Sequence, residues 1–293
     1  MTGFCNFEDC DSIFRSSNLH IESAAIGDRG KVRRKNEDAF VADTRTAVFM
    51  VADGMGGHAA GEIASRMAVQ TAMQCLAERN PDLDQKKQLH EAICRANARV
   101  YDTQKKTPEY HGMGSTLTVL TFDADRYYLG QVGDSRAYLL RNGRLRQLSR
   151  DHSLVWPFYE NGTITKEEIA KHPHKHLLTR CIGMYPEVEV DLYDDAAREN
   201  DVFMLCSDGL TDVLTDKVIQ QILVKSGLIP EKACRDFIRA ANDSGGPDNI
   251  TAVVIALMAA GHPRSRFSSR LHSIFRTDHG TRKPPRIPRI AAD

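Results

Sequence analysis

Acidic residues close several apolar runs of this sequence, and their type and spacing are suited to binding metal ions. Four such clusters occur: Asn36-Glu37-Asp38, Ala52-Asp53-Gly54, Ser207-Asp208-Gly209 and Pro247-Asp248-Asn249. Carboxylates at strand ends lie on a rigid rim and can converge on one point. Their oxygens are the ligands that Mg²⁺ and Mn²⁺ prefer. A glycine after the aspartate, such as Gly54, lets a backbone carbonyl approach a metal without side-chain hindrance.

Each cluster also has a simpler interpretation. An Asp-Gly pair after an apolar run is most often a hairpin turn, and Asp248-Asn249 alone fits a turn before a strand. However, Asp53-Gly54 and Asp208-Gly209 each precede a segment with helical character rather than a returning strand. A hairpin turn is therefore disfavoured at both Asp-Gly pairs. The four clusters together favour a site for divalent metal ions.

A basic loop precedes the first cluster and offers a cationic partner for a phosphate group. Arg33 lies four residues before Glu37, followed by Arg34 and Lys35. Arginine presents planar, paired donors that match phosphate oxygens, and it keeps its charge near neutrality. We expect Arg33 to hold phosphate and Arg34 and Lys35 to be solvated.

The sequence disfavours two other phosphate chemistries, dinucleotide binding and an aspartyl-phosphate nucleophile. The segment from Gly54 to Ala59 fits the dinucleotide fingerprint G-x-G-x-x-A, but Asp53 would place a like charge against the pyrophosphate. Asp123-Ala124-Asp125 resembles an aspartyl-phosphate loop, but Tyr127 stands where a small residue is expected, and a hairpin turn fits better. The sequence contains neither a cysteine with an arginine six positions later nor a P-loop.

The strands and helices that must position these clusters occur in neighbouring groups of the same type. Apolar, β-branched runs predict strands at 47–52, 115–122, 126–132, 137–141, 144–148, 202–206 and 250–257. Helical periodicity predicts helices at 62–79, 84–103, 216–225 and 230–241. Strands next to strands and helices next to helices favour an α+β fold with antiparallel sheets over a regular βαβ alternation.

Composition indicates an ordinary globular protein with an uneven charge distribution. The 293 residues are 41% hydrophobic and 27% charged, and the formal net charge is zero. Residues 261–293 carry eight Lys and Arg against two Asp, so this stretch has a net charge of +6 and the rest of the chain −6. We expect an irregular extension over 1–20, a domain over 21–258 and a basic flexible tail over 259–293.

The longest apolar stretch, the first residues and the cysteines give no indication of export or membrane insertion. The longest apolar stretch, 250–260, is about half of the roughly 20 residues that a membrane helix needs, and the first residues lack a signal-peptide pattern. The seven cysteines form no C-x-x-C pair, which is typical of buried thiols in a reducing compartment. We expect a cytoplasmic location.

The order of motifs resembles the metal-dependent protein phosphatase family, also called the protein phosphatase 2C family, in its bacterial form. Eight blocks over about 240 residues carry the resemblance: Gly30-x-x-Arg33-x-x-Asn36-Glu37-Asp38, Asp53-Gly54-Met55-Gly56-Gly57-His58, Gly112-Met113-Gly114-Ser115-Thr116-Leu117, Val132-Gly133-Asp134-Ser135-Arg136, Asp151-His152-Ser153-Leu154, Leu178-Thr179-Arg180-x-x-Gly183, Ser207-Asp208-Gly209-Leu210 and Pro247-Asp248-Asn249-Ile250-Thr251. The resemblance implies a two-sheet antiparallel β-sandwich with helices on both sides (α-β-β-α). It also implies hydrolysis of phosphoserine and phosphothreonine by a metal-activated water, without a covalent intermediate.

The resemblance also assigns roles to the site residues. It places two Mn²⁺ or Mg²⁺ ions on Asp53, which bridges them, with the Gly54 carbonyl on one ion and Asp208 and Asp248 on the other. Asp38 would act partly through coordinated waters, and Glu37 and Asn249 would support the ligands. Asp134 matches the position that, with Asp208, holds a third ion in bacterial relatives. Arg33 matches the phosphate-binding arginine. His58 is a candidate general acid, and it departs from the position of the acid proposed in animal relatives in that Met55-Gly56-Gly57 precede it.

One segment departs from the family pattern. Trp156-Pro157-Phe158-Tyr159 forms a stiff aromatic patch where relatives begin a polar, mobile flap helix. We expect the segment up to His176 to lie beside the active site and to help select substrates. The expected substrates are phosphoproteins, modified by a cognate serine/threonine kinase, and the chain is expected to be a monomer.

Two other classes of function stay open on the sequence. One is a phosphoprotein-binding module that keeps the fold without catalysis, which the complete set of acidic positions disfavours. The other is a nucleic-acid-associated protein that binds through the basic tail, and unchanged retention on heparin after truncation at residue 260 would exclude it.

Overall fold

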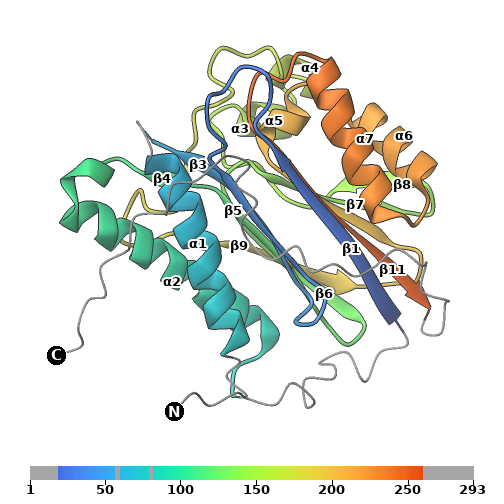
Figure 1. Ribbon diagram of the computed structural model, residues 1–293, viewed down its shortest axis with the longest axis horizontal. Coiled ribbons are helices and arrows are strands. Elements are labelled where there is room, and N and C mark those ends of the chain that lie inside the picture. Colours follow the sequence, from blue (N-terminus) through green and yellow to red (C-terminus); the bar gives the residue numbers. More distant parts are fainter. Residues whose placement is uncertain (1–18, 57–59, 79–81, 260–293) are drawn as a thin grey trace, which may run out of the picture. The chain divides into compact units, whose positions relative to one another are not determined.

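Two antiparallel β-sheets pack face to face and carry helices on their outer faces (Figure 1). The computed structural model describes residues 19–56, 60–78 and 82–259. One sheet has the order β1-β11-β10-β7-β8 and the other the order β2-β3-β5-β6-β9, with β4 paired to β3. The predicted α-β-β-α sandwich is confirmed.

The strands of the first sheet are β1 (Leu19–Asp28), β7 (Arg136–Arg141), β8 (Arg144–Gln147), β10 (Val202–Cys206) and β11 (Ile250–Ala259). Those of the second are β2 (Asp38–Asp43), β3 (Val48–Met55), β4 (Gly114–Ser115), β5 (Leu117–Asp123), β6 (Arg126–Val132) and β9 (Asp191–Ala196). The helices are α1 (Ala60–Ala77), α2 (Gln85–Lys106), a 3-10 turn η1 (Pro108–Tyr110), α3 (Trp156–Glu160), α4 (Lys166–Ile169), α5 (Asp208–Thr211), α6 (Asp216–Ser226) and α7 (Pro230–Asp243).

Three apolar layers hold this arrangement together. Side chains of the two inner sheet faces form the central layer, where Phe203 makes edge-to-face contacts with Phe122 and Tyr127 at 5.3 and 5.0 Å between ring centres. A second layer lies between α1, α2 and the sheet that contains β3. A third lies between α6, α7 and the sheet that contains β11. Burial of these apolar faces is the main term that stabilises the sandwich.

The predicted elements occur with shifts of a few residues, and three strands were missed. The Asn142-Gly143 hinge joins β7 to β8 with positive φ angles of 52° and 72°, as a type I′ turn requires. The sequence analysis did not predict β1, β2 or β9. Strands β1 and β11 extend past the expected 21–258 domain, since Leu19 pairs with Ala259.

The basic tail and His58 lie outside the described residues. Within the described ranges, no helix is long and apolar enough to cross a membrane.

Candidate metal centre

Several strands bring their acidic residues to the same end of the sandwich. Asp38 begins β2 and lies directly opposite Asp53 of β3 in the antiparallel register. Asp208 follows β10 and opens α5, and Asp248 precedes β11. The four clusters thus meet because neighbouring strands begin or end at this edge.

Asp38 is held by hydroxyl groups from the other sheet. Ser207 Oγ and Thr251 Oγ1 each donate to Asp38 Oδ2 at 2.7 Å, while Asp38 Oδ1 is buried without a hydrogen-bond partner. Burial, followed by the charges of Asp208 and Asp248, raises the pKa of Asp38 to about 7, against the two hydroxyl bonds that lower it. A cation beside Asp38 Oδ1 would stabilise the ionised form of this carboxylate.

Asp53 and Asp134 also have a raised pKa, because they are buried beside other carboxylates. Burial, and then the charges of Asp38 and Asp208, raise the pKa of Asp53 well above its ordinary value. Burial and the charge of Asp208 do the same for the pKa of Asp134. Such mutual repulsion among buried carboxylates marks a site that divalent cations would neutralise.

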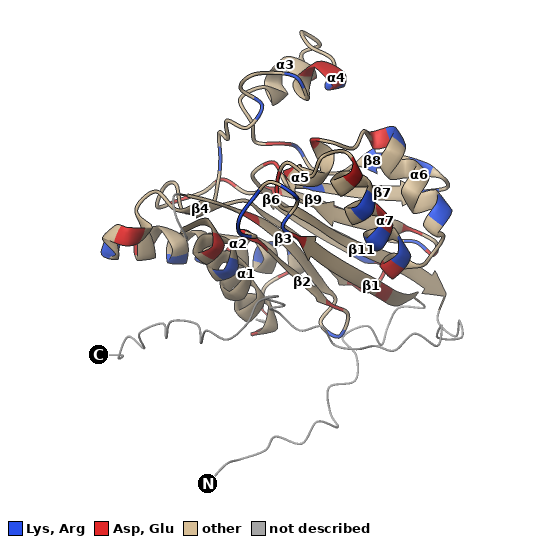
Figure 2. Cartoon of the chain, turned by 45° about the horizontal axis from the view of Figure 1, so that its top comes forward, with Lys and Arg blue, Asp and Glu red and all other residues tan. Residues whose placement is uncertain are grey.

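Arg33 reaches the centre from the loop between β1 and β2, which is rich in Lys and Arg (blue in Figure 2). Arg33 Nη2 donates to Asp248 Oδ2 at 2.7 Å, and both side chains stay partly exposed. This hydrogen bond, the largest influence, raises the pKa of Arg33. The guanidinium is thus charged and accessible at the edge of the acidic cluster.

Asn249 fixes the Arg33 loop to the start of β11. Its Nδ2 donates to the carbonyls of Arg29 at 3.0 Å and Lys35 at 2.8 Å, and its Oδ1 accepts from Glu37 N at 2.8 Å. Asn249 thus sets the path of the loop that carries Arg33.

Gly54 and Glu37 lie against the start of α1. A Cβ atom on Gly54 would lie 2.1 Å from the Gly61 carbonyl oxygen and 2.6 Å from that of Glu37. Only glycine fits at this approach of β3 to α1. Burial raises the pKa of Glu37 more than the nearby basic side chains lower it.

Asp134 lies in a turn that buried polar contacts support on both sides. Before it, Gly133 N donates to His152 Nδ1 at 3.2 Å and His152 Nε2 lies 3.2 Å from Asp191 Oδ2. After it, Arg136 makes a bidentate ion pair with Asp151, at 2.9 Å for Nε and 2.6 Å for Nη2 to Oδ2. Burial lowers the pKa of His152, which suits a neutral ring that positions the turn.

The residues of this centre fit divalent metal ions. The donors are oxygens only, which suits Mg²⁺ and Mn²⁺. Asp38 Oδ1 and Asp208 Oδ1 are both buried without hydrogen-bond partners, and unpaired buried oxygens of this kind are costly unless a cation satisfies them.

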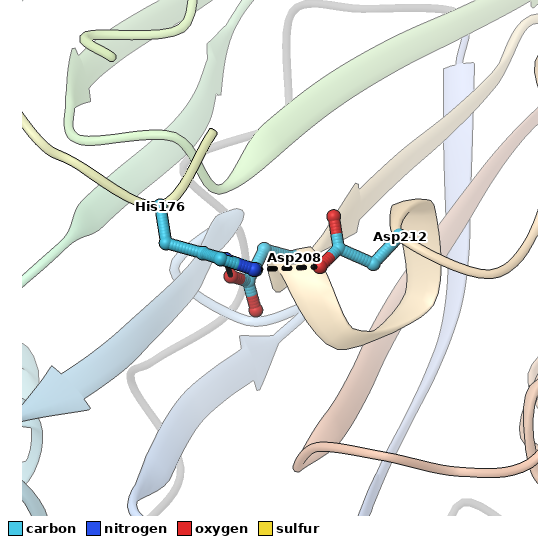
Figure 3. Close-up of side chains that lie close together, drawn as sticks. All are labelled: His176, Asp208 and Asp212. Carbon is cyan, nitrogen blue, oxygen red and sulfur yellow. Dashed lines mark ion pairs between the residues drawn. The ribbon is translucent and has the colours of Figure 1, made fainter. Parts of the chain in front are cut away.

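A second group of possible ligands was missed by the sequence analysis. His176 Nδ1 lies 3.6 Å from Asp208 Oδ2, and its Nε2 lies 3.8 Å from Asp212 Oδ2 (Figure 3). The interaction with the Asp208 carboxylate, the largest influence, raises the pKa of His176. Burial acts to raise the pKa of Asp208, but the bonds from His176 and Asp53 outweigh it, and this pKa is lowered. The four-residue spacing of Asp208 and Asp212 on one helical turn was the available signal.

The segment 153–178 carries His176 to the centre. It contains α3 and α4, which project beyond the sandwich in Figure 2. The aromatic patch of the sequence analysis lies in a short helix, residues 156–160, with Pro157 in its first turn and Trp156 buried. Proline is tolerated at this position because its missing N–H would have no partner there.

Comparisons with known proteins agree with the motifs. A family model described as protein phosphatase 2C matches residues 30–244. The serine/threonine protein phosphatase PstP of Mycobacterium tuberculosis is 40% identical over 238 residues, which are 80% of this chain but 45% of PstP. This chain thus spans less than half of PstP. The serine/threonine phosphatase stp of Listeria innocua is 37% identical over 246 residues, covering 81% of this chain and 97% of stp.

A solved structure matches the fold as well as the sequence. The catalytic domain of PstP in complex with 2 manganese ions superposes with a TM-score of 0.75 at 36% identity, covering 82% of this chain and 99% of that domain. The family model spans more than half of the chain, and the resemblance first stated on its eight motif blocks is confirmed: this chain belongs to the protein phosphatase 2C family.

Proposed function

We propose that this chain is a metal-dependent protein serine/threonine phosphatase whose active site is the centre of Asp38, Asp53, Asp208 and Asp248. The observation that carries the proposal is the convergence of these carboxylates on one edge, with two buried oxygens that lack partners and with Arg33 on Asp248. Membership of the protein phosphatase 2C family supports the same reaction.

The chain's own residues would divide the work as follows. Asp53, the Gly54 carbonyl, Asp208 and Asp248 would hold two Mn²⁺ or Mg²⁺ ions, with Asp38 beside them and Asp134 available for a third. When bound, the ions supply a nucleophilic water at neutral pH and positive charge for the phosphoryl oxygens. Arg33 would exchange Asp248 for the substrate phosphate and stabilise its oxygens during transfer.

Phosphoproteins are the proposed substrates, since relatives of the chain are named serine/threonine protein phosphatases. The cognate kinase, the monomeric state and the cytoplasmic location expected from the sequence belong to this proposal. His58 stays a candidate for the proton donor to the leaving oxygen.

The test replaces single metal ligands. We expect Asp208→Ala and Asp248→Ala each to abolish Mn²⁺-dependent hydrolysis of p-nitrophenyl phosphate, because each removes a charge that holds an ion. Circular dichroism should show an unchanged fold, and calorimetry with Mn²⁺ should show weaker metal binding. The matched control is Asp102→Ala, which removes an exposed carboxylate of α2. Full activity in both ligand variants would refute the site, and no Mn²⁺-dependent phosphate release by the unchanged chain would favour a binding module.

A further inference from the structure

A cavity that is widely open to solvent lies at the end of β7 away from the metal centre, and residues of both sheets line it. Its volume is about 480 Å³, and it is lined by Leu139, Arg141, Asn142, Arg144, Arg146 and Asp195. Strand β7 begins at Arg136, beside Asp134, and runs away to the Asn142-Gly143 turn. The cavity is therefore separate from the carboxylate cluster.

The strand register explains why arginines face this cavity. Leu139 pairs with Arg146 and Arg141 with Arg144 across the β7–β8 hairpin, while Leu140 pairs with Leu145 between them. Leu140 and Leu145 contact the layer under α6 and α7, so they occupy the outer face. Because side chains alternate along a strand, Leu139 and the three arginines share the inner face, where Leu139 joins the central layer.

Arg141 is held in place by three hydrogen bonds within the protein. It donates to Asp201 Oδ1 at 2.8 Å, to Asp201 Oδ2 at 2.6 Å and to the Ala196 carbonyl at 2.7 Å. The side chain of Asp201 is only 1% exposed. Arg141 is thus a fixed wall of the cavity rather than an available donor.

Arg144 and Arg146 keep their donors available. Arg146 Nη2 lies 3.9 Å from Asp195 Oδ2, and both side chains are more than half exposed. Arg144 makes no ion pair within the described part of the chain and lies opposite Arg141. Asp201 already neutralises Arg141, so Arg144 is the guanidinium of this facing pair that can receive an anion.

The alternative role for these arginines is protection of an edge. Strand β8 is the last strand of its sheet, and inward-pointing charges on edge strands discourage pairing with other chains. That role requires charge alone. It does not require a cavity whose lining combines one arginine fixed by Asp201 with two others that no carboxylate binds closely.

We propose that this cavity, the β7–β8 pocket, is a second oxyanion site that binds a phosphate group through Arg144 and Arg146. Guanidinium groups present paired donors that match phosphate oxygens, and the volume lies in the range of small-ligand pockets. Asp195 on the opposite wall would repel a chain of phosphates and accept a hydrogen bond from a hydroxyl or ammonium group near a single phosphate. The phosphate is either free or carried by a peptide.

The test is a titration of the full chain, with saturating Mg²⁺, by amide nuclear magnetic resonance. Inorganic phosphate should shift the amide signals of residues 139–146 with a dissociation constant on the order of 1 mM or tighter. Signals near Arg33 and Asp208 report the active site in the same spectra. A second titration uses a peptide with a phosphonate in place of phosphoserine, so that it is not hydrolysed. The tighter of the two probes identifies the source of the phosphate.

The variants Arg144→Gln and Arg146→Gln should weaken the shifts at 139–146 at least about tenfold and leave those near Arg33 in place. Arg99→Gln on α2 is the matched control, since it removes an equally charged side chain from an exposed helix surface. The proposal is overturned if residues 139–146 do not respond to phosphate, or if chloride at equal ionic strength shifts them equally. The arginines would then serve edge protection alone. Loss of phosphatase activity would leave this readout unaffected, so the two proposals fail independently.

Discussion

Single carboxylates in the metal centre work against the stability of the metal-free protein. Asp38, Asp53 and Asp134 all have a raised pKa because burial and like charges disfavour their ionised forms. A carboxyl with a raised pKa in the folded state contributes stability that is present below its unfolded pKa, about 4. That contribution is lost as the pH rises through the folded pKa, which is about 7 for Asp38. Bound cations would restore it.

The first prediction follows from this sign. In EDTA, Asp38→Asn should unfold at a higher temperature than the unchanged chain at a pH of about 8 and at a similar temperature at about 5. Asparagine can still accept from Ser207 and Thr251 but carries no charge. Thermal unfolding followed by circular dichroism measures both chains. The unchanged chain is the reference at each pH, because both chains contain His152. The lowered pKa of His152 makes the stability of both chains change with pH in the opposite direction. Equal unfolding temperatures at both values would contradict the prediction.

Asn249 supplies a second prediction at this scale. Asn249→Ala removes three hydrogen bonds that hold the Arg33 loop, so we expect a loss of about 1–3 kcal/mol of stability. The KM for p-nitrophenyl phosphate should also rise, because Arg33 is less well positioned. Urea unfolding and steady-state kinetics measure the two effects.

Asn97 is a matched control for Asn249. It is buried and also makes three hydrogen bonds, to the carbonyls of Tyr185 and Pro186 and from Gly183 N. Asn97→Ala should lose a similar amount of stability without the rise in KM. If both variants change KM alike, Asn249 acts on stability alone.

Sequence patterns predicted the chemical types at the centre but not its supporting contacts. Aspartates at the ends of apolar strands predicted Asp53 and Asp208, because a buried strand followed by a carboxylate is a local pattern. The contacts of Ser207 and Thr251 with Asp38 link residues more than 160 positions apart. Local patterns carry no information about such pairs, and His176 was missed for the same reason.

At the scale of elements, burial made strands predictable from their composition, whereas the exposed edge strand β8 was predictable only through its Asn142-Gly143 turn. Strands β10 and β11 are almost wholly buried and read as continuous apolar runs. Strand β9 (Asp-Leu-Tyr-Asp-Asp-Ala) and strand β1 lie at sheet edges and are mostly half-buried. Edge strands need few apolar residues, so their composition resembles that of loops. The sequence analysis missed them for this reason.

The segment of α3 and α4 provides a prediction about elements. Val155, Trp156 and Ile169 form a small apolar cluster of their own, and Trp156 Nε1 donates to Glu160 Oε1 at 3.0 Å. Trp156→Ala should unfold this segment locally, since removal of a buried tryptophan costs about 3–5 kcal/mol. We expect kcat/KM for phosphopeptides to fall more than for p-nitrophenyl phosphate, because only the longer substrate would extend to α3 and α4.

The control for Trp156→Ala is Val224→Ala, at an exposed apolar side chain on α6 that is 52% accessible. Deletion of residues 156–172 should reproduce the difference between the two substrates. An equal proportional change for phosphopeptide and small substrate would show that the segment does not help select substrates.

The whole molecule depends on close contacts between backbones where the parts of the centre meet. A Cβ atom on Gly209 would lie 2.0 Å from the Asn249 carbonyl oxygen, and one on Gly54 would lie 2.1 Å from that of Gly61. Gly209 lies in the first turn of α5 after β10, and Asn249 leads into β11, so this contact sets how these two neighbouring strands present Asp208 and Asp248. The second contact sets α1 against β3. The carboxylates converge because these backbones approach so closely.

Gly209→Ala tests this dependence in the last prediction. Backbone atoms cannot yield as a flexible side chain can, so we expect a loss of about 3 kcal/mol or more together with loss of Mn²⁺-dependent activity. Gly143→Ala is the comparison, since its Cβ would meet nothing within 4 Å although its φ is +72°. It should cost only about 1–2 kcal/mol through backbone strain and keep the activity. Urea unfolding and phosphate release measure both variants. If Gly209→Ala were no more harmful than Gly143→Ala, the strands could move apart without losing the centre, and the close backbone approach would not determine the positions of Asp208 and Asp248.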